Sequence, residues 1–91
     1  MVEYQASIKV MLKPTVLDPQ GVAVKNSLAT MGYDAVTALR VGKHLELRLE
    51  ADDETSARRL VEEMCDQLLA NPVVEEYHVE LARAGGEKGG T

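Results

Sequence analysis

The chain has 91 residues, of which 45% are hydrophobic and 27% charged, and 15 acidic against 10 basic side chains give a net charge of −5. A chain of this length forms one domain with a thin core, and such domains often complete their core by oligomerising. The acidic balance and the lack of tryptophan and phenylalanine argue against nucleic-acid binding, which needs a positive surface and stacking side chains.

Three further features bear on where the protein works. No apolar run approaches the roughly 18–20 residues of a membrane span. The first residues carry an acid where a signal peptide needs positive charge, and no long apolar segment follows. Cys65 is the single cysteine, so the chain forms no internal disulfide. We therefore expect a cytoplasmic protein.

Residues 4–12 alternate between apolar and other side chains, a period of two that predicts a half-buried strand. We expect Pro14 to end this strand, because proline donates no hydrogen bond to a neighbouring strand. The expected inward-facing residues are Tyr4, Ala6, Ile8, Val10 and Leu12.

A helix should follow, with Asp18 as its N-cap and Pro19 at its first position. Apolar residues then recur at helical spacing as far as Gly32, a residue that commonly ends helices. These apolar residues are Val24, Leu28 and Met31.

Residues 34–41 predict a second strand that is apolar on both faces, with Val36 and Ala38 on the outer one. A strand of this kind is either sandwiched or lies at an interface. Gly42 and Lys43 predict a two-residue hairpin. The third strand alternates strictly, and its inward-facing residues are Leu45, Leu47, Leu49 and Ala51.

A second helix should begin at Asp52 or Asp53 and end at Asn71-Pro72, and a last strand should cover residues 73–81. A broad apolar stripe is expected to face the core. It consists of Ala57, Leu60, Val61, Met64, Leu68 and Leu69.

The element order is therefore βαββαβ. It predicts an α+β fold of ferredoxin-like type, a two-layer sandwich with two helices on one face of a four-stranded antiparallel sheet. The opposite face would carry Met11, Val36 and Ala38 among polar residues, and a partly apolar open face invites a partner.

Candidate catalytic residues are few. Cys65 lies beside the apolar stripe, as is typical of a buried structural thiol. His44 and His78 lie on polar strand faces with no serine or cysteine nearby. The acidic run 52–54 lacks the oxygen spacing of a calcium loop. We expect no catalytic, cofactor-binding or metal-binding residue in the chain.

Fold alone leaves several functions open. An acylphosphatase would need an arginine after the first strand, a metal chaperone a Cys-x-x-Cys motif, and an RNA-recognition domain aromatic residues on the third strand; the chain has none of these. A regulatory domain of ACT-like type, binding a small ligand as a dimer, stays open because its ligands need no sharp motif.

We expect several residues to contact a partner protein. Val16 and Leu17 are apolar loop residues held between two prolines, which suits either docking or cover for the sheet edge. The full set of partner-interface candidates is Lys13, Val16, Leu17, Val36, Ala38, Gly42, Lys43 and Asn71.

Four segments together resemble the PurS family, the small subunit of bacterial and archaeal phosphoribosylformylglycinamidine synthase. They are LDPQG at 17–21, LATMGYDAV at 28–36, LRVGKHLEL at 39–47 and LLANPVVEEYHVE at 68–80. Their order and spacing carry the resemblance, which covers about residues 3–81. We expect a PurS-like domain over 1–83 and a disordered glycine-rich tail over 84–91.

The resemblance implies a non-catalytic subunit of a ligase complex of the ATP-dependent glutamine amidotransferase type, which makes formylglycinamidine ribonucleotide in de novo purine biosynthesis. The implied partners are a large synthetase subunit and a glutaminase subunit, which this subunit bridges while supporting ammonia transfer. ATP, Mg and glutamine are used by the complex, and no cofactor is bound by this subunit. A homodimer or a dimer of dimers is also implied.

Overall fold

The computed structural model describes residues 1–84. The predicted tail, from residue 85 onward, lies outside the described residues. The elements are β1 (Val2–Leu12), α1 (Pro19–Thr30), β2 (Gly42–Ala51), α2 (Glu54–Met64), a π-helical turn (Cys65–Leu69) and β3 (Glu75–Arg83). No helix of the described residues is both long and apolar enough to span a membrane.

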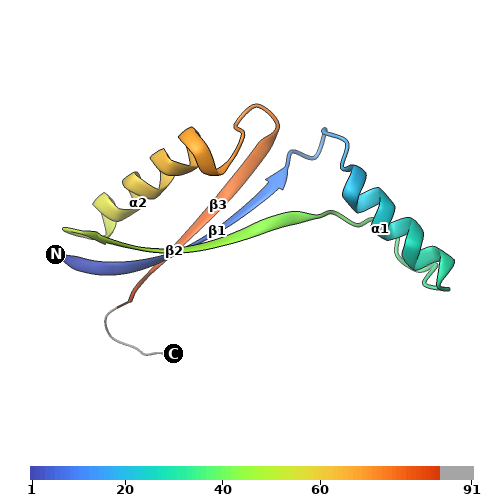
Figure 1. The fold of residues 1–91 in the computed structure, drawn as a ribbon, viewed down its shortest axis with the longest axis horizontal. Coiled ribbons are helices and arrows are strands. Elements are labelled where there is room, and N and C mark those ends of the chain that lie inside the picture. The colour runs from blue at the N-terminus through green and yellow to red at the C-terminus, as the bar shows by residue number, and fades with distance from the viewer. Residues whose placement is uncertain (85–91) are drawn as a thin grey trace.

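The described strands form one three-stranded antiparallel sheet in the order β2-β1-β3 (Figure 1). The register pairs Met11 with Gly42 at one end of β1 and Val2 with Ala51 at the other. The predicted α+β class is therefore confirmed, but the four-stranded sheet is wrong, because residues 34–41 form no strand.

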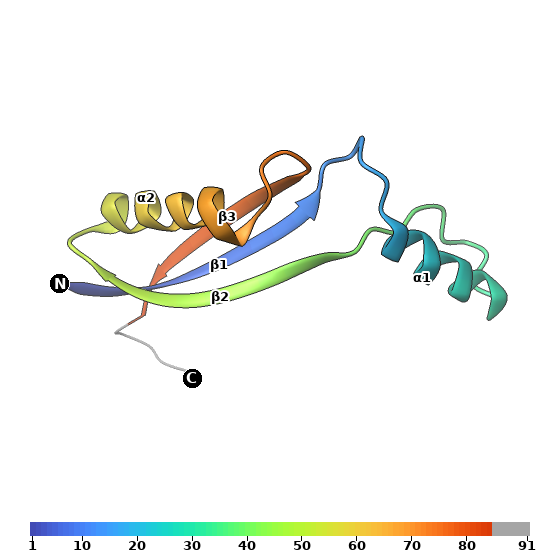
Figure 2. The same cartoon turned by 45° about the horizontal axis from the view of Figure 1, so that its top comes forward.

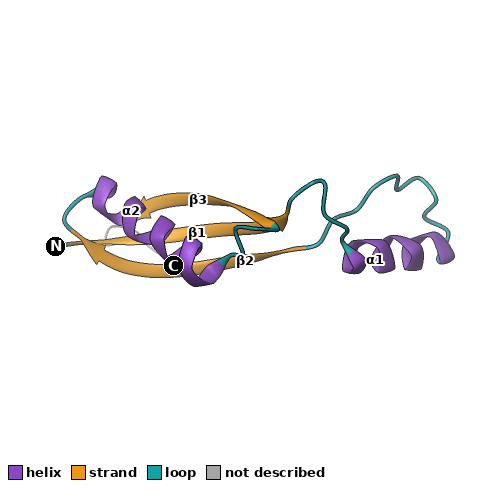
Figure 3. Cartoon of the chain, turned by 90° about the horizontal axis from the view of Figure 1, so that it is seen from above, coloured by secondary structure: helices purple, strands orange, loops and turns teal. Residues whose placement is uncertain are grey.

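The core lies between the sheet and α2, which covers one face (Figure 3). The alternation of β1 predicted its buried side correctly, since Tyr4, Ala6, Ile8 and Val10 are all at most 6% exposed. From α2 the buried side chains are Ala57 and Val61, followed by Cys65 one turn later. Asp53 caps α2 by accepting a hydrogen bond from the Ser56 N–H at 2.8 Å.

Helix α1 makes no substantial packing contact with the sheet or α2 and projects beyond the sheet (Figures 1 and 2). The prediction that both helices cover one sheet face is wrong for the single chain. The molecule measures 52 × 32 × 15 Å, with a radius of gyration of 17.0 Å. A compact chain of this length would have a radius of about 12 Å.

The segment 33–41 runs back beside α1 to the start of β2 (Figure 3). It has no neighbouring strand, so its backbone groups cannot form a ladder, and apolar composition alone did not make it a strand. We call residues 18–41 the arm. The arm separates β1 from β2, so the predicted hairpin at Gly42 and Lys43 is also wrong; both residues lie within β2.

Gly42 has a different structural role from the predicted one. A Cβ at this position would overlap Met11 Sδ and lie 2.5 Å from the Val10 carbonyl oxygen. The residue is therefore a glycine because β1 and β2 approach closely where the arm leaves the sheet.

Candidate partner interfaces

The proline-bracketed turn lies at one end of the sheet. Its backbone is fixed by two hydrogen bonds, from the Lys13 N–H to the Val74 carbonyl at 2.8 Å and from the Val16 N–H to the Lys13 carbonyl at 2.9 Å. Val16 is half-buried, whereas Leu17 is 75% exposed. Of the two apolar residues, only Leu17 presents its side chain mainly to solvent.

The first of these bonds joins the turn to the loop that leads into β3. That loop carries Val73, which is 77% exposed, and the preceding helical turn carries Leu68, which is 82% exposed. We call residues 13–17 and 68–74 the tip. Leu68 was predicted to face the core, but the π-helical turn changes the helical phase after Cys65, so the core-facing row does not continue to Leu68.

Asn71, a predicted partner-interface residue, organises the tip internally. Its side-chain oxygen accepts from the Val73 N–H at 3.1 Å, and its carbonyl accepts from the Glu75 N–H at 2.7 Å. Its own N–H donates to the Glu75 carboxylate at 2.6 Å. The tip is therefore held by short local hydrogen bonds that leave Val73 outside.

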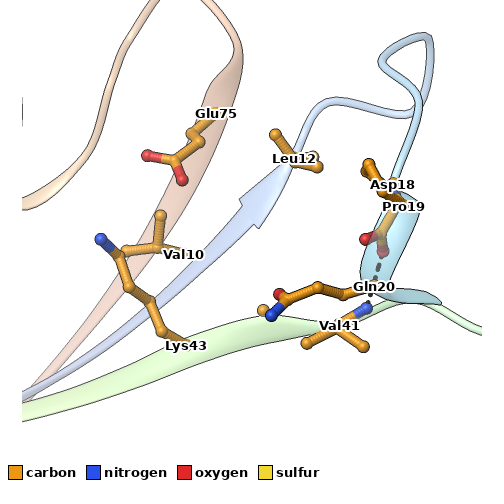
Figure 4. A pocket seen from close by; sticks show the side chains of 9 residues that line it. Val10, Leu12, Asp18, Pro19, Gln20, Val41, Lys43 and Glu75 are labelled. Carbon is orange, nitrogen blue, oxygen red and sulfur yellow. Dashed lines mark hydrogen bonds between the residues drawn. The ribbon is translucent and has the colours of Figure 1, made fainter. Parts of the chain in front are cut away.

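Asp18 joins the two ends of the arm. Its Oδ1 accepts from the Gly21 N–H at 3.0 Å, which confirms the predicted N-cap, and its Oδ2 accepts from the Val41 N–H at 2.8 Å (Figure 4). These hydrogen bonds lower the pKa of Asp18 below its usual value, and the hydrogen bond from Val41 has the largest effect.

A cleft of about 230 Å³ lies between the base of the arm and the sheet (Figure 4). Val10, Leu12 and Val41 give it apolar walls. The charged residues that line it are Lys43, Asp18 and Glu75, one positive group and two negative groups. Lys43, predicted as a partner contact, therefore lines this cleft.

The arm exposes apolar side chains that the single chain leaves uncovered. Val22 is 48% exposed, Val24 43%, Met31 70% and Tyr33 57%. The predicted interface residues Val36 and Ala38 belong to this arm and not to a sheet face; Val36 is half-buried and Ala38 exposed.

A second apolar surface lies beside α2. Arg58 Nη1 donates to the Val79 carbonyl of β3 at 3.3 Å, so that flank of α2 faces β3. At 3.6 residues per turn, Leu60 and Met64 lie on the opposite flank, toward β2. They are 41% and 37% exposed, although the stripe pattern predicted them in the core.

The residues of β2 below this flank are also incompletely covered. Leu45, Leu47 and Leu49 face the same side of the sheet as the buried residues of β1, yet they are only half-buried. With Leu60 and Met64 they form what we call the apolar strip. Sequence periodicity identified its members but could not show that the helices of residues 1–84 cover them only in part.

The side chains that could carry chemistry are dispersed. Cys65 is buried, and burial raises the pKa of its thiol. His44 and His78 each pair with an exposed glutamate, Glu46 at 3.2 Å and Glu80 at 3.6 Å respectively. Within residues 1–84, no group of three or more His, Cys, Asp or Glu side chains is placed to hold a metal ion.

Residues 5–83 match the family described as PurS, phosphoribosylformylglycinamidine (FGAM) synthase. The chain is 49% identical over 83 residues to the PurS subunit of this synthase from Synechocystis, covering 91% of this chain and 83% of that protein. It is 46% identical over 78 residues to the Bacillus subtilis subunit, covering 86% and 92%.

Solved structures agree in fold. The chain superposes on Bacillus subtilis PurS with a TM-score of 0.81 at 45% identity, covering 88% of this chain and 99% of that one. It superposes on a chain of the structure of PurLQS from Thermotoga maritima with a TM-score of 0.83 at 35% identity, covering 90% and 100%. The family match spans the sheet, α2 and the arm alike, and the chain belongs to the PurS family of FGAM synthase subunits.

Proposed function

We propose that the chain is the non-catalytic subunit of a phosphoribosylformylglycinamidine synthase complex in purine biosynthesis, where it bridges the large synthetase and glutaminase subunits and supports ammonia transfer. The observation that carries the proposal is the match of 90% of this chain to the whole of a chain of the Thermotoga maritima PurLQS structure. A PurS from Methanocaldococcus jannaschii is likewise described as one of the subunits of formylglycinamide ribonucleotide amidotransferase in the purine biosynthetic pathway.

The proposal assigns the chemistry to the other subunits. ATP, Mg and glutamine would be used there, in the cytoplasm, and this chain would hold no cofactor of its own. The buried thiol of Cys65 and the dispersed, exposed His44 and His78 support this division, because nucleophilic catalysis needs an accessible nucleophile beside its base.

We assign docking on a larger subunit to the tip. Leu17, Leu68 and Val73 are each at least 75% exposed, and they lie on the two segments of the tip that the Lys13–Val74 hydrogen bond joins. The backbone beneath them is fixed by the Lys13–Val74 hydrogen bond and the turns around Asn71. A rigid surface loses little conformational entropy on binding.

The tip assignment is tested in the reconstituted complex. Leu17→Ser should leave the unfolding free energy within about 0.5 kcal/mol of wild type, as for other exposed positions. It should slow glutamine-dependent product formation while sparing the ammonia-dependent activity of the large subunit alone. Leu17→Met, which keeps the apolar volume, is the matched control and should behave as wild type. Unchanged glutamine-dependent turnover by Leu17→Ser at limiting subunit concentration would exclude docking through Leu17.

We further propose a homodimer in which each arm lies on the apolar strip of the other copy. Isolated helices shorter than about 12–15 residues are marginal in water, and α1 has 12 residues and makes no substantial contact with the sheet or α2. The helix is about 18 Å long, enough to cover the roughly 14 Å between Leu45 and Leu49. The second copy would then supply the helix that the sequence pattern predicts over the sheet.

Cysteine cross-linking tests this exchange, because the native Cys65 is buried. Val24→Cys combined with Leu60→Cys should form a disulfide between two chains and give a covalent dimer on a non-reducing gel. Val24→Cys with Glu62→Cys, on the flank of α2 that faces β3, is the control and should not cross-link. A disulfide within one chain would show that the arm folds back on its own sheet, and a stable monomer at micromolar concentration would overturn the dimer.

The cleft favours a second candidate function, a regulatory domain that binds a small ligand. Three charged residues, Lys43, Asp18 and Glu75, line the cleft, and its volume of about 230 Å³ is below the roughly 300 Å³ of most ligand pockets. Asp18 already accepts two backbone hydrogen bonds, which leaves Lys43 and Glu75 to bind groups of opposite charge. Such a site would suit a small zwitterion. Calorimetric titration with amino acids and nucleotides distinguishes the two functions, since heat abolished by Lys43→Ala would support the regulatory one.

A further inference from the structure

β3 is an outer strand of the sheet, and the register fixes which of its backbone groups point away from β1. The Ala84 N–H donates to the Glu3 carbonyl at 2.9 Å, and the Lys13 N–H donates to the Val74 carbonyl at 2.8 Å. Both bonds continue the register of β1 and β3, so the even-numbered residues of β3 direct their N–H and C=O groups toward β1. Because these directions alternate along an antiparallel strand, the odd-numbered residues direct theirs outward. We call these outward groups the β3 edge; they belong to Glu75, Tyr77, Val79, Leu81 and Arg83.

Arg58 of α2 occupies the middle of the β3 edge. Its Nη1 donates to the carbonyl of Val79 at 3.3 Å, which agrees with the outward direction that the register assigns to this group. Arg58 is half-buried, and within residues 1–84 its guanidinium has no carboxylate at salt-bridge distance. The side chain therefore reaches from α2 to the edge of the sheet, where its charged end contacts the backbone.

The start of the β3 edge is also occupied. The Glu75 N–H donates to the Asn71 carbonyl at 2.7 Å within the tip. Between this bond and that of Arg58 the edge contains only Tyr77, and beyond Arg58 it contains only Leu81 and Arg83. A strand that paired along the whole of β3 would have to displace Arg58, because the carbonyl of Val79 is the central acceptor of that ladder.

The other outer strand, β2, has no such obstruction among the described residues. By the same alternation, its outward groups belong to His44, Glu46, Arg48 and Glu50. No other backbone group of residues 1–84 forms a hydrogen bond with them. The flank of α2 toward β2 carries Leu60 and Met64, whose side chains have no hydrogen-bond donor. The sheet is therefore open along β2 and obstructed along β3.

An outer strand with free backbone groups is a template for pairing with another chain, and proteins commonly protect it with a charged side chain. A strand added to β3 would enclose the guanidinium of Arg58 without a carboxylate, which is unfavourable because a buried charge needs a partner. We propose that Arg58 closes the β3 edge against strand addition. This role is separate from the arm and the apolar strip, since it concerns the flank of α2 that faces β3.

Replacing Arg58 by methionine tests the proposal. Arg58→Met keeps an unbranched side chain but removes the charge and the donor, so the carbonyl of Val79 becomes free. Arg59→Met is the matched control, because it makes the same chemical change at the next, exposed position of α2. The probe is a synthetic peptide with the sequence of β1, VEYQASIKVML, the strand that already pairs with the other side of β3.

The measurement is residue-resolved amide hydrogen exchange of the full chain with and without excess peptide. The N–H groups of Tyr77 and Leu81 have no backbone acceptor within residues 1–84, so a strand added to β3 would protect them. In Arg58→Met we expect the peptide to slow their exchange at least about tenfold, whereas wild type and Arg59→Met should show no change. His78 and Glu80, whose N–H groups point toward β1, should exchange slowly in all three proteins, which shows that the sheet is intact.

Three results would overturn the proposal. Protection of Tyr77 and Leu81 by the peptide in wild type would show that the edge is open, and this result does not depend on how well the variants fold. Unchanged exchange in Arg58→Met, with His78 and Glu80 still slow, would show that Arg58 does not close the edge. Equal protection in Arg58→Met and Arg59→Met would assign the effect to net charge and not to the contact with Val79.

Discussion

The Asp18 carboxylate accepts a hydrogen bond from the backbone N–H of Val41 at 2.8 Å, across 23 residues of the chain. The other oxygen of the same carboxylate caps α1 at Gly21. One side chain therefore starts the helix and closes the base of the arm where the chain returns to the sheet. This places the direction in which α1 leaves the sheet under the control of a single residue.

Asp18→Ala and Asp18→Asn should separate these two roles. Alanine removes both hydrogen bonds, and the loss of a typical cap lowers the melting temperature of a domain of this size by about 4–8 °C. Asparagine is as good a cap as aspartate but has only one acceptor oxygen. Amide hydrogen exchange should therefore show Gly21 still protected and Val41 unprotected in Asp18→Asn. Full protection of Val41 in this variant would contradict the dual role.

The same contact predicts an acid-sensitive arm. The Val41 hydrogen bond, followed by that from Gly21, holds the pKa of Asp18 below its usual 3.8. A group with a lowered native pKa stabilises the fold above its unfolded pKa and loses that contribution as pH falls through the native value. Exchange protection at Val41 should thus be constant above about pH 5 and fall below pH 3.8, whereas Asp18→Asn should show no such step.

Two glycines at the base of the arm should not tolerate alanine. At Gly21 a Cβ would lie 2.6 Å from the Leu39 carbonyl oxygen, and at Gly42 it would lie 2.5 Å from that of Val10. Both clashes involve backbone, which cannot turn aside as a side chain can. We expect a loss of about 1–3 kcal/mol in urea-melt stability from either Gly→Ala change, the usual cost of overpacking. This reverses the stabilisation that alanine normally gives at a helical position such as Gly21.

Local signals predicted local structure well. The alternation of β1, the capping residues Asp18 and Asp53, and Gly32 after α1 all carry their information within a few residues, and each is confirmed. The placement of α1 was wrong, because apolar residues at helical spacing predict a helix but not the surface on which that helix packs. The same gap made residues 34–41 look like a strand, since apolar residues that accompany a helix resemble those that enter a sheet.

The candidate interfaces also include some residues that the sequence identified and others that it did not. Leu17 could be identified from the sequence because it is an apolar residue between two prolines and has no role in local structure. Its side chain is exposed, as the docking hypothesis requires. Leu68 and Val73 were missed, because the π-helical turn that exposes Leu68 gives no pattern in the sequence.

Tyr77 offers a spectroscopic test of how the π-helical turn after α2 is joined to β3. Its hydroxyl donates to the Asp66 carboxylate at 3.0 Å. Burial, and then this hydrogen bond and the charge of Asp66, raise the pKa of Tyr77 from 10.0 to about 12. Because the native state favours the protonated phenol, its contribution to stability is complete below pH 10 and is lost between pH 10 and about 12.

The pKa of Tyr77 can be isolated by absorbance titration, as the difference between wild type and Tyr77→Phe. We expect the phenolate of Tyr77 to form only near pH 12 in the native protein. Asp66→Asn keeps an acceptor oxygen but removes the negative charge, so the pKa should fall toward, but not reach, the unperturbed 10.0, because burial remains. A wild-type transition already at pH 10 would show that neither the burial of Tyr77 nor its hydrogen bond to Asp66 holds in solution. An unchanged transition in Asp66→Asn would show that the negative charge of Asp66 does not contribute to the raised pKa.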